Sequence, residues 1–275
     1  MADAKHKWVM GLRPGNVEAF FARRDPTDAV RRERAHWLDE DPEKYAALTD
    51  AAHSPLRETV ELAQTLGVSI NPALPPWAQL LELGRGWEAD FAWMHPDDKG
   101  DHRLIGGVVC FPSSWALRDK LQRTMSETHH PVPGLNAELD SKIETFFARM
   151  SPGVAWLREN AGYSRVPDLN QHPDRPRPPL GKTVVVDEFW IRLEHQLLLK
   201  LPISRSILFA IRMEVVPLRR VLESPATAAG LARLLETMPY APAEYKGLTD
   251  AREAIILLLR AAESDTATDP PDDWK

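Results

Sequence analysis

Residues 106–134 read GGVVCFPSSWALRDKLQRTMSETHHPVPG, and the pattern within this stretch determines how the chain on either side is arranged. It opens as an apolar strand over 106–111, breaks at a Pro-Ser-Ser sequence and continues with the spacing of an amphipathic helix. Two histidines, His129 and His130, then precede Pro131. Because the residue before a proline is disfavoured in helical backbone, the pair is predicted where a helix gives way to an extended turn. An imidazole in such a place can be held over a pocket.

Strand patterns flank this stretch on its N-terminal side. Residues 87–94 alternate large apolar with small or charged side chains, as a half-buried strand does, and a polar turn leads from them into the apolar run 103–111. A hairpin of two antiparallel strands is therefore predicted. The turn at 95–102 contains histidines and aspartates, but its solvated composition favours an ordinary polar turn over a metal site.

Helices and further strands are predicted on the C-terminal side. Ser114 is placed to cap a helix that runs through Met125, and a second amphipathic helix follows at 139–150. Residues 194–201 are short and apolar and are predicted to be helical. The remaining strand patterns are 154–166, 183–193 and 206–216, and C-terminal helices are predicted at 225–238 and 248–262.

Two strands, a helical insertion and three further strands are the order of an α+β domain with a central antiparallel sheet, one face of which the insertion covers. The N-terminal third reads as helical, and the proline-rich sequence 71–76 is the clearest internal boundary. The predicted organisation is an N-terminal helical region at 1–70, a core with C-terminal helices at 71–262, and a disordered acidic tail at 263–275. A second proline-rich stretch, 167–182, is expected to lie on the surface or fold over the core as a lid or partner contact.

Composition excludes several classes of protein. The 275 residues are 43% hydrophobic, which suits a sizeable core, and the net charge of −6 argues against a nucleic acid or an anionic membrane as partner. No apolar run is long enough to cross a membrane, and the N-terminus shows no apolar signal core. The single cysteine, Cys110, excludes a disulfide framework and a cysteine-rich metal centre. We expect a cytoplasmic protein that binds neither nucleic acid nor a membrane.

Three segments together resemble a bacterial family of haem-dependent oxidative N-demethylases: FPSSW at 111–115, HHPVPG at 129–134 and IRLEHQLLLKLPISRSILFAIR at 191–212. The resemblance extends over roughly residues 10–260. It implies a PAS-like fold that binds haem b, and a monooxygenase that removes a methyl group from a small secondary amine such as dimethylamine with release of formaldehyde. Dioxygen and electrons from a separate flavin and iron–sulfur reductase complete the implied reaction.

The family pattern carries over residue by residue, with three departures. His129, two residues before Pro131, occupies the family's histidine position. The other matching residues are Arg158, Asn160, Arg192, Glu194, Gln196 and Arg212. The departures are Ala161 in place of tryptophan, His195 in place of arginine and Ala210 in place of threonine. Because these three positions are well placed to shape the pocket, the resemblance leaves the substrate open.

The resemblance assigns His129 to the haem iron. Neutral imidazole is the commonest side chain to ligate a haem iron, so the residue type suits the role. His130 and His195 remain alternative ligands. Cys110 lies in an apolar strand and is interpreted as a small buried hydrophobic residue rather than a thiolate ligand.

The two propionates of a haem need cationic partners. Arg158, Arg192 and Arg212 are the arginines predicted to meet them through charge-assisted hydrogen bonds. Salt bridges to Glu194 or Glu214 would explain each arginine equally well, so both interpretations stay open.

Glu194 and Tyr163 are the candidate catalytic residues, because a protonated amine needs a carboxylate or an aromatic face in a dry pocket. Trp115 is assigned to cofactor binding, with Trp115 and Phe111 packing against the porphyrin or the core. The chain shows no flavin, dinucleotide or iron–sulfur signature, so a partner must supply electrons. Two other hypotheses are a non-catalytic haem sensor or carrier and an interaction module without cofactor. The substrate, the electron donor and the oligomeric state, a homo-oligomer included, stay open.

Overall fold

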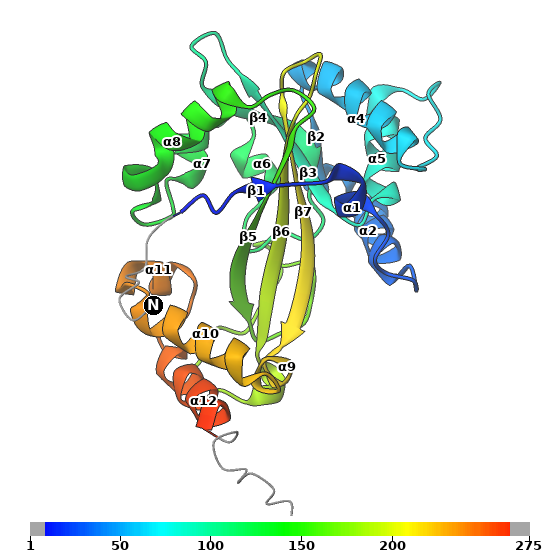
Figure 1. Cartoon of the computed structure of the whole chain (residues 1–275). Helices are drawn as coiled ribbons and strands as arrows, with labels where there is room; N and C mark the ends of the chain where they lie inside the picture. The colour runs from blue at the N-terminus through cyan, green and yellow to red at the C-terminus, as the bar shows by residue number, and fades with distance from the viewer. Residues whose placement is uncertain (1–8, 265–275) are drawn as a thin grey trace, which may run out of the picture.

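One antiparallel sheet of seven strands runs through the described part of the chain, residues 9–264 of a computed structural model (Figure 1). The strand order is β1-β5-β6-β7-β3-β4-β2, and every neighbouring pair is antiparallel. The α+β class predicted from the sequence is therefore confirmed. The strands are β1 (Arg13–Pro14), β2 (Ala46–Leu48), β3 (Asp90–Pro96), β4 (His102–Val108), β5 (Ala155–Ser164), β6 (Trp190–Lys200) and β7 (Ile207–Pro217).

Helices surround the sheet in three groups, which Figure 1 shows to its right, to its left and below it. The N-terminal group comprises α1 (Val17–Phe21), α2 (Ala29–Glu40), α3 (Pro42–Tyr45), α4 (His53–Thr65) and α5 (Pro76–Gly86). The group between β4 and β5 comprises α6 (Leu117–Lys120), α7 (Met125–His129) and α8 (Leu135–Arg149). The C-terminal group comprises α9 (Leu218–Leu222), α10 (Pro225–Thr237), α11 (Tyr240–Tyr245) and α12 (Arg252–Ser264).

Strand β6 packs against different helices on its two faces, because successive side chains of a strand point to opposite sides. On one face, Leu197 and Leu199 join the main core with the N-terminal helices, and Ile191 packs with the C-terminal helices. On the other face, Leu198 packs with α7 and α8. We call these two sides of the sheet the α5 face and the α8 face. Helices from three parts of the chain thus bury both sides of β6.

The helix predicted at 194–201 is wrong, because β6 continues as one strand through Lys200 and pairs with β5 and β7 along its length. Three consecutive leucines, 197–199, are at most 5% exposed, since helices cover both faces there. A strand buried on both sides loses the alternation that marks a strand in a sequence. The strand predicted from residue 183 also starts later, at Trp190, after a short 3-10 helix at Val186–Glu188.

The single helix predicted from Ser114 to Met125 is also wrong. Ser114 has left-handed backbone (φ 69°), and its hydroxyl accepts a hydrogen bond from Arg177 at 2.9 Å instead of capping a helix. The chain forms the short α6 and then the separate helix α7, whose N-cap is Thr124.

Most other elements lie where the sequence places them. The N-terminal third is largely helical as expected, but it also contains a strand: Asp41 caps α3 and accepts the Lys44 N–H at 3.1 Å, this helix ends at Tyr45, and Ala46–Leu48 form β2 at the edge of the sheet. The β3–β4 hairpin, α8, α10 and α12 agree with the predicted ranges to within a few residues. The predicted acidic tail lies outside the described residues except for its first two, which belong to α12.

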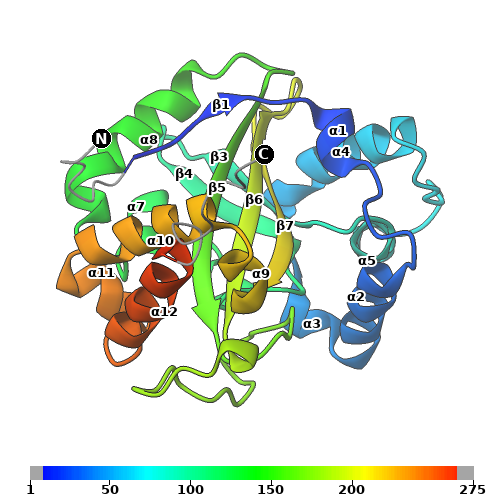
Figure 2. The same ribbon diagram turned by 60° about the horizontal axis from the view of Figure 1, so that its bottom comes forward.

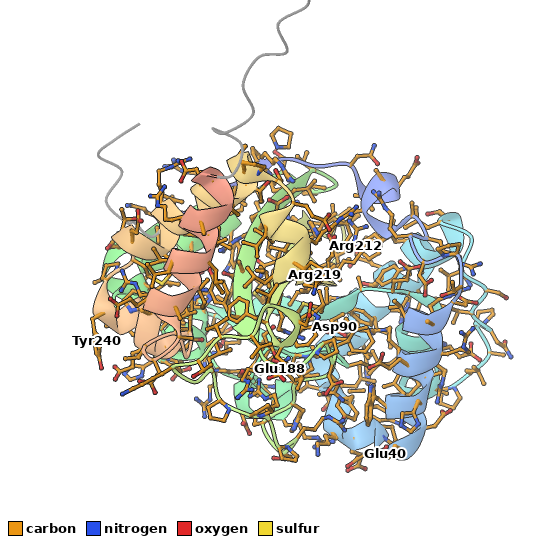
Figure 3. All side chains as sticks on the ribbon, turned by 90° about the horizontal axis from the view of Figure 1, so that it is seen from below. Glu40, Asp90, Glu188, Arg212, Arg219 and Tyr240 are labelled. Carbon is orange, nitrogen blue, oxygen red and sulfur yellow. The ribbon has the colours of Figure 1, made fainter. Side chains whose placement is uncertain are left out.

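Asp90, at the start of β3, fixes the turn that follows β4. Its carboxylate accepts the N–H of Cys110 at 2.7 Å and of Phe111 at 2.9 Å, and it contacts the guanidinium of Arg34 from α2. Asp90 is 2% exposed and Arg34 is 0% exposed. Figure 3 labels Asp90 between the N-terminal and C-terminal helices. This buried ion pair therefore directs the chain from the sheet into the FPSSW segment.

We predict that Asp90→Ala destabilises the protein by about 3–5 kcal/mol, because it leaves the Arg34 charge and two backbone N–H groups buried without a partner. Chemical denaturation followed by circular dichroism measures the loss. Asp187→Ala is the control, since it breaks an exposed pair with Arg219 and should leave the midpoint unchanged. Equal midpoints for Asp90→Ala and the wild type would contradict the assignment.

Candidate functional site

Helix α7 presents His129 at its last position. The helix begins with a capping box, in which Thr124 Oγ1 accepts the Glu127 N–H at 3.2 Å and the Glu127 carboxylate accepts the Thr124 N–H at 2.8 Å. Lys120 donates to the carbonyl of Thr128 at 2.9 Å, and α8 donates a further hydrogen bond to the α7 backbone at 2.8 Å. A helix of five residues is too short to be stable alone, so these contacts hold His129 in place.

The side chain of His129 is half-buried. Its Nδ1 is buried and has no hydrogen-bond partner among the described residues. Burial, followed by the charges of Arg158 and Lys120, lowers the pKa of His129 from 6.5 to about 4. The imidazole is therefore neutral at pH 7 with a free lone pair, which is the form that binds a metal.

His130 has different surroundings from its neighbour. It is exposed, and it keeps helical backbone angles (φ −49°, ψ −38°). The prediction that Pro131 forces it out of the helical region is therefore wrong. The Val132 N–H donates to the His129 carbonyl at 2.8 Å, and this turn continues from the helix in spite of the proline. Of the two histidines, only His129 is withdrawn from solvent.

Four polar side chains of β5 and β6 lie together on the α8 face. The strand register pairs Arg158 with Gln196 and Asn160 with Glu194. Glu194 is 8% exposed and accepts hydrogen bonds from Asn160 Nδ2 at 3.2 Å and from Gln196 Nε2 at 2.7 Å. Two amides thus fix this buried carboxylate in position, and it retains acceptor capacity for a cation.

Arg158 connects this cluster to His129. Burial lowers the pKa of Arg158, and the charge of Glu194 opposes this effect. The charge of Arg158 in turn lowers the pKa of His129. The guanidinium therefore lies within electrostatic reach of both side chains. Its Nε is buried and has no hydrogen-bond partner among the described residues. Buried polar atoms without partners are rare and call for an explanation. Two such atoms, on His129 and on Arg158 within electrostatic reach of it, are what a ligand with a metal and an anionic group would satisfy.

Arg192 binds the proline-rich stretch. Its Nη1 and Nη2 donate to the carbonyls of Asp168 at 2.6 Å and Leu169 at 2.9 Å, and its Nε donates to the Ser113 hydroxyl at 3.4 Å. The residue is 1% exposed, and burial lowers its pKa to about 10 against the opposing charge of Glu194. All three nitrogens are engaged, so the structure places Arg192 as a positioning residue for the loop.

The proline-rich stretch folds over the FPSSW segment, one of the two placements expected for it. The Gln171 N–H donates to the carbonyl of Pro112 at 3.1 Å, and its carbonyl accepts the Ser114 N–H at 3.1 Å. Asn170, Gln171 and His172 are at most 5% exposed. The centre of this loop is therefore part of the core.

Tyr163 lies on the α5 face, on the opposite side of the sheet from Glu194. It pairs in register with Ile191 and packs in the core of the C-terminal helices, 6.0 Å from the ring of Phe189. Burial raises the pKa of Tyr163 to about 12. The structure therefore does not bring the two predicted catalytic residues together.

Arg212 and His195 also lie on the α5 face. Arg212 donates to the carbonyl of Phe20 at 3.0 Å, and Figure 3 labels it on the side of the sheet next to the N-terminal helices. His195 forms a contact of 2.9 Å between its Nε2 and the carboxylate of Glu214. Neither side chain points to the side of the sheet that carries Glu194, as the strand pairing shows.

Trp115 and Cys110 are packed in the core. Trp115 is half-buried against Leu104, Val109 and Leu117. Cys110 is 0% exposed, and burial raises the pKa of its thiol to about 12. A thiol that stays protonated is a poor metal ligand, which agrees with the interpretation of Cys110 as a small hydrophobic residue.

Two lysines near the cluster are absent from the sequence-based set. Lys120 contributes to the low pKa of His129, and Lys246, which follows α11, donates to the carbonyl of Ala161 on β5 at 2.6 Å. Lys246 lies outside every motif, so no signal in the sequence points to it. Lys120 lies between two recognised motifs and has no distinctive spacing.

Other features of the described residues are distinct from this cluster. A hollow of about 350 Å³ beside β2 is lined by Glu43, Ala47, Leu48, Trp77, Arg118 and Leu121, none of them a predicted site residue. Within residues 9–264, no three His, Cys, Asp or Glu side chains are arranged to hold a metal ion, and no helix is long and apolar enough to span a bilayer. A haem iron differs from such a site, because the porphyrin supplies most of its ligands and one imidazole suffices.

Residues 42–256 match the model of a family described as haem-dependent oxidative N-demethylase, alpha subunit-like. The match covers well over half of the 275 residues, so this chain belongs to that family. The resemblance inferred from three short segments is therefore confirmed. His129, Arg158 and Glu194 all lie inside the matched range. The unpartnered imidazole and guanidinium nitrogens fit a haem, which offers an iron to the first and carboxylates to the second.

We predict that His129 makes the stability of the apoprotein fall with acidity between pH 6.5 and 4. Its pKa is lower in the folded state than in the unfolded state, so the unfolded chain binds more protons in this window. The stability that the neutral His129 contributes is present above pH 6.5, and the free energy of unfolding decreases by roughly 3 kcal/mol as the pH falls towards 4. Chemical denaturation at several pH values compares the wild type with His129→Gln, which should lose this part of the pH dependence.

His130→Gln is the matched control, because His130 is the exposed neighbour of His129. This substitution should leave the pH dependence of stability unchanged. If His129→Gln retains the full pH dependence of the wild type, the imidazole is not withdrawn from water in the folded protein.

Proposed function

We propose that this chain binds haem b with His129 as the protein ligand of the iron, and that it catalyses the oxidative N-demethylation of a small amine. Dioxygen is the proposed oxidant and a separate reductase the proposed source of electrons. The observation that carries the proposal is the neutral His129 imidazole, with a buried Nδ1 that lacks a partner, in a member of a family described as haem-dependent.

The haem, when bound, supplies the activation of dioxygen and the oxidation of the carbon next to nitrogen. The residues of this chain bind and orient. The Thr124 capping box and Lys120 keep α7 in place, so that His129 is offered in one orientation. Arg158 faces the same region with an unused donor, which suits a propionate.

Glu194 is the residue we assign to the amine. Its carboxylate is buried on the α8 face, where Asn160 and Gln196 hold it by two hydrogen bonds. An ammonium group of the substrate gains a charge-assisted hydrogen bond there, and exclusion of water strengthens this contact. We do not carry Tyr163 forward as a partner of Glu194, because it lies on the other side of the sheet.

The strand order supports the PAS-like core that the family resemblance implies. Strands β3 and β4 precede the helical insertion, β5 to β7 follow it, and β7 returns to pair with β3. The insertion, α6 to α8, then lies over the face that carries Glu194 and Arg158. We propose that the haem lies between this insertion and the sheet.

We predict that His129→Ala loses the Soret band, or binds haem more than about tenfold more weakly, because it removes the imidazole assigned to the iron. Titration of apoprotein with haem measures the affinity. His130→Ala should bind haem like the wild type. Unchanged haem content and spectrum in His129→Ala would refute the ligand assignment, and the absence of a Soret band in the haem-supplied wild type would refute the whole proposal.

We predict that Glu194→Gln keeps its haem but loses affinity for a protonated amine by about tenfold or more, because it removes the buried charge and keeps the shape. The shift of the Soret band during titration with dimethylamine gives the affinity, and formaldehyde release with a surrogate reductase gives the activity. Glu214→Gln, an exposed carboxylate on the α5 face, is the control.

Equal amine affinity in Glu194→Gln and the wild type would remove Glu194 from the substrate site. Haem-loaded wild type that releases no formaldehyde from any N-methylamine tested would favour a non-catalytic haem protein.

A further inference from the structure

The C-terminal helices reach the edge of the site through one lysine. Figure 2 shows α10, α11 and α12 beside β5. Here β5 is at the edge of the sheet, because β1 pairs only with Trp156 and Leu157. Lys246, the residue after α11, closes this edge by donating from Nζ to the carbonyl of Ala161 at 2.6 Å.

Lys246 approaches the same cluster from the C-terminal helices. Ala161 follows Asn160, whose amide binds Glu194 at 3.2 Å, and Arg158 precedes it on the same strand. Burial lowers the pKa of Lys246. The charge of Glu194 opposes this effect and the charge of Arg158 adds to it, so the ammonium group of Lys246 lies within electrostatic reach of both side chains.

The cations outnumber the carboxylates at this place. Among the described residues, Arg158 has a buried Nε without a partner, and Lys246 has three donors but one acceptor, a neutral carbonyl. The carboxylate within electrostatic reach of both is Glu194, which already accepts hydrogen bonds from two amides. An excess of positive charge withdrawn from water is unfavourable unless an anion joins it.

Other charged groups near Arg158 and Lys246 do not supply that anion. Lys120 adds a further positive charge near His129, and Arg192 uses its donors on the proline-rich loop. Tyr245, next to Lys246, is a neutral phenol whose pKa burial raises. An anion that pairs with them would therefore come with a ligand.

We propose that Arg158 and Lys246 form a carboxylate-binding pair, supplied jointly by β5 and the C-terminal helices, which grips the ligand of this site. The proposal rests on the proposed function, because the ligand that brings a carboxylate there is either the haem, through a propionate, or an amine substrate that carries its own carboxylate. In both cases α11 becomes part of the binding site, and ligand binding strengthens the docking of the C-terminal helices on the sheet.

The first experiment tests the propionate without relying on iron. Metal-free protoporphyrin IX and its dimethyl ester are titrated into apoprotein, and porphyrin fluorescence gives both affinities. We expect Lys246→Gln to weaken binding of the free acid about tenfold while leaving that of the ester unchanged. Lys246→Arg, which keeps the charge, should restore the preference for the acid, and Lys142→Gln on the exposed face of α8 is the control.

The second experiment tests the substrate. Haem-loaded wild type and Lys246→Gln are titrated with N-methylglycine and with dimethylamine, and the Soret shift gives the affinities. If Lys246→Gln binds both porphyrins normally but selectively loses affinity for N-methylglycine, the carboxylate belongs to the substrate. Thermal denaturation of each variant shows that it is folded.

The two proposals fail in different ways. If His129→Ala binds haem like the wild type, the iron ligand is wrong, but the metal-free titration still judges the carboxylate pair. If folded Lys246→Gln binds all four ligands with the affinities of the wild type, the pair does not bind a carboxylate and Lys246 only anchors α11. The same conclusion follows if the wild type binds the free acid and the ester equally well, and N-methylglycine and dimethylamine equally well.

Discussion

The pairing of β6 with both of its neighbours decides which of its side chains face the site. A shift of one residue in this register would exchange the two faces, so that Glu194 would leave the α8 face and His195 would replace it. Apolar packing prevents the shift, because Leu197 belongs to the main core and Leu198 to the core under α8. The polar half of β6 is thus positioned by hydrophobic contacts of the other half, several residues away on the same strand.

Two arginines on the α8 face show how surroundings separate a structural role from a binding role. Arg192 and Arg158 lie on adjacent strands and both match the family pattern. The donors of Arg192 are satisfied by two carbonyls and a hydroxyl, so a ligand would have to displace the loop to reach them. Arg158 has a buried nitrogen without a partner, and leaving such a group unsatisfied costs about 1–3 kcal/mol. Both are arginines at positions of the family pattern, yet only Arg158 has a buried donor left without a partner among the described residues.

The sequence was sufficient where one physical signal acted alone. Alternation located β7 and the β3–β4 hairpin, and the family motif selected His129, Arg158 and Glu194 as candidates, which the fold connects through Arg158. It failed where two effects overlapped: burial of β6 on both faces removed its alternation, and apolar residues at helical spacing over 114–125 concealed a break in the helix. The start of α7 could have been found, since Thr124 and Glu127 have the spacing of a capping box. Lys246 could not, because only the path of α11 around the sheet brings it to β5.

The electrostatics of the site favour a ligand that brings a metal and an anion together. Arg158 and Lys120 help to keep His129 neutral, and therefore able to coordinate, by making protonation unfavourable. A simple carboxylate that bound Arg158 would weaken this effect and make protonation of His129 easier. Binding of an anion alone would therefore reduce the ability of His129 to coordinate a metal. A ligand that occupies the lone pair with a metal and neutralises the cations with carboxylates satisfies both groups at once. Haem has this composition, which is why the unpartnered nitrogens of His129 and Arg158 have more meaning as a pair than either has alone.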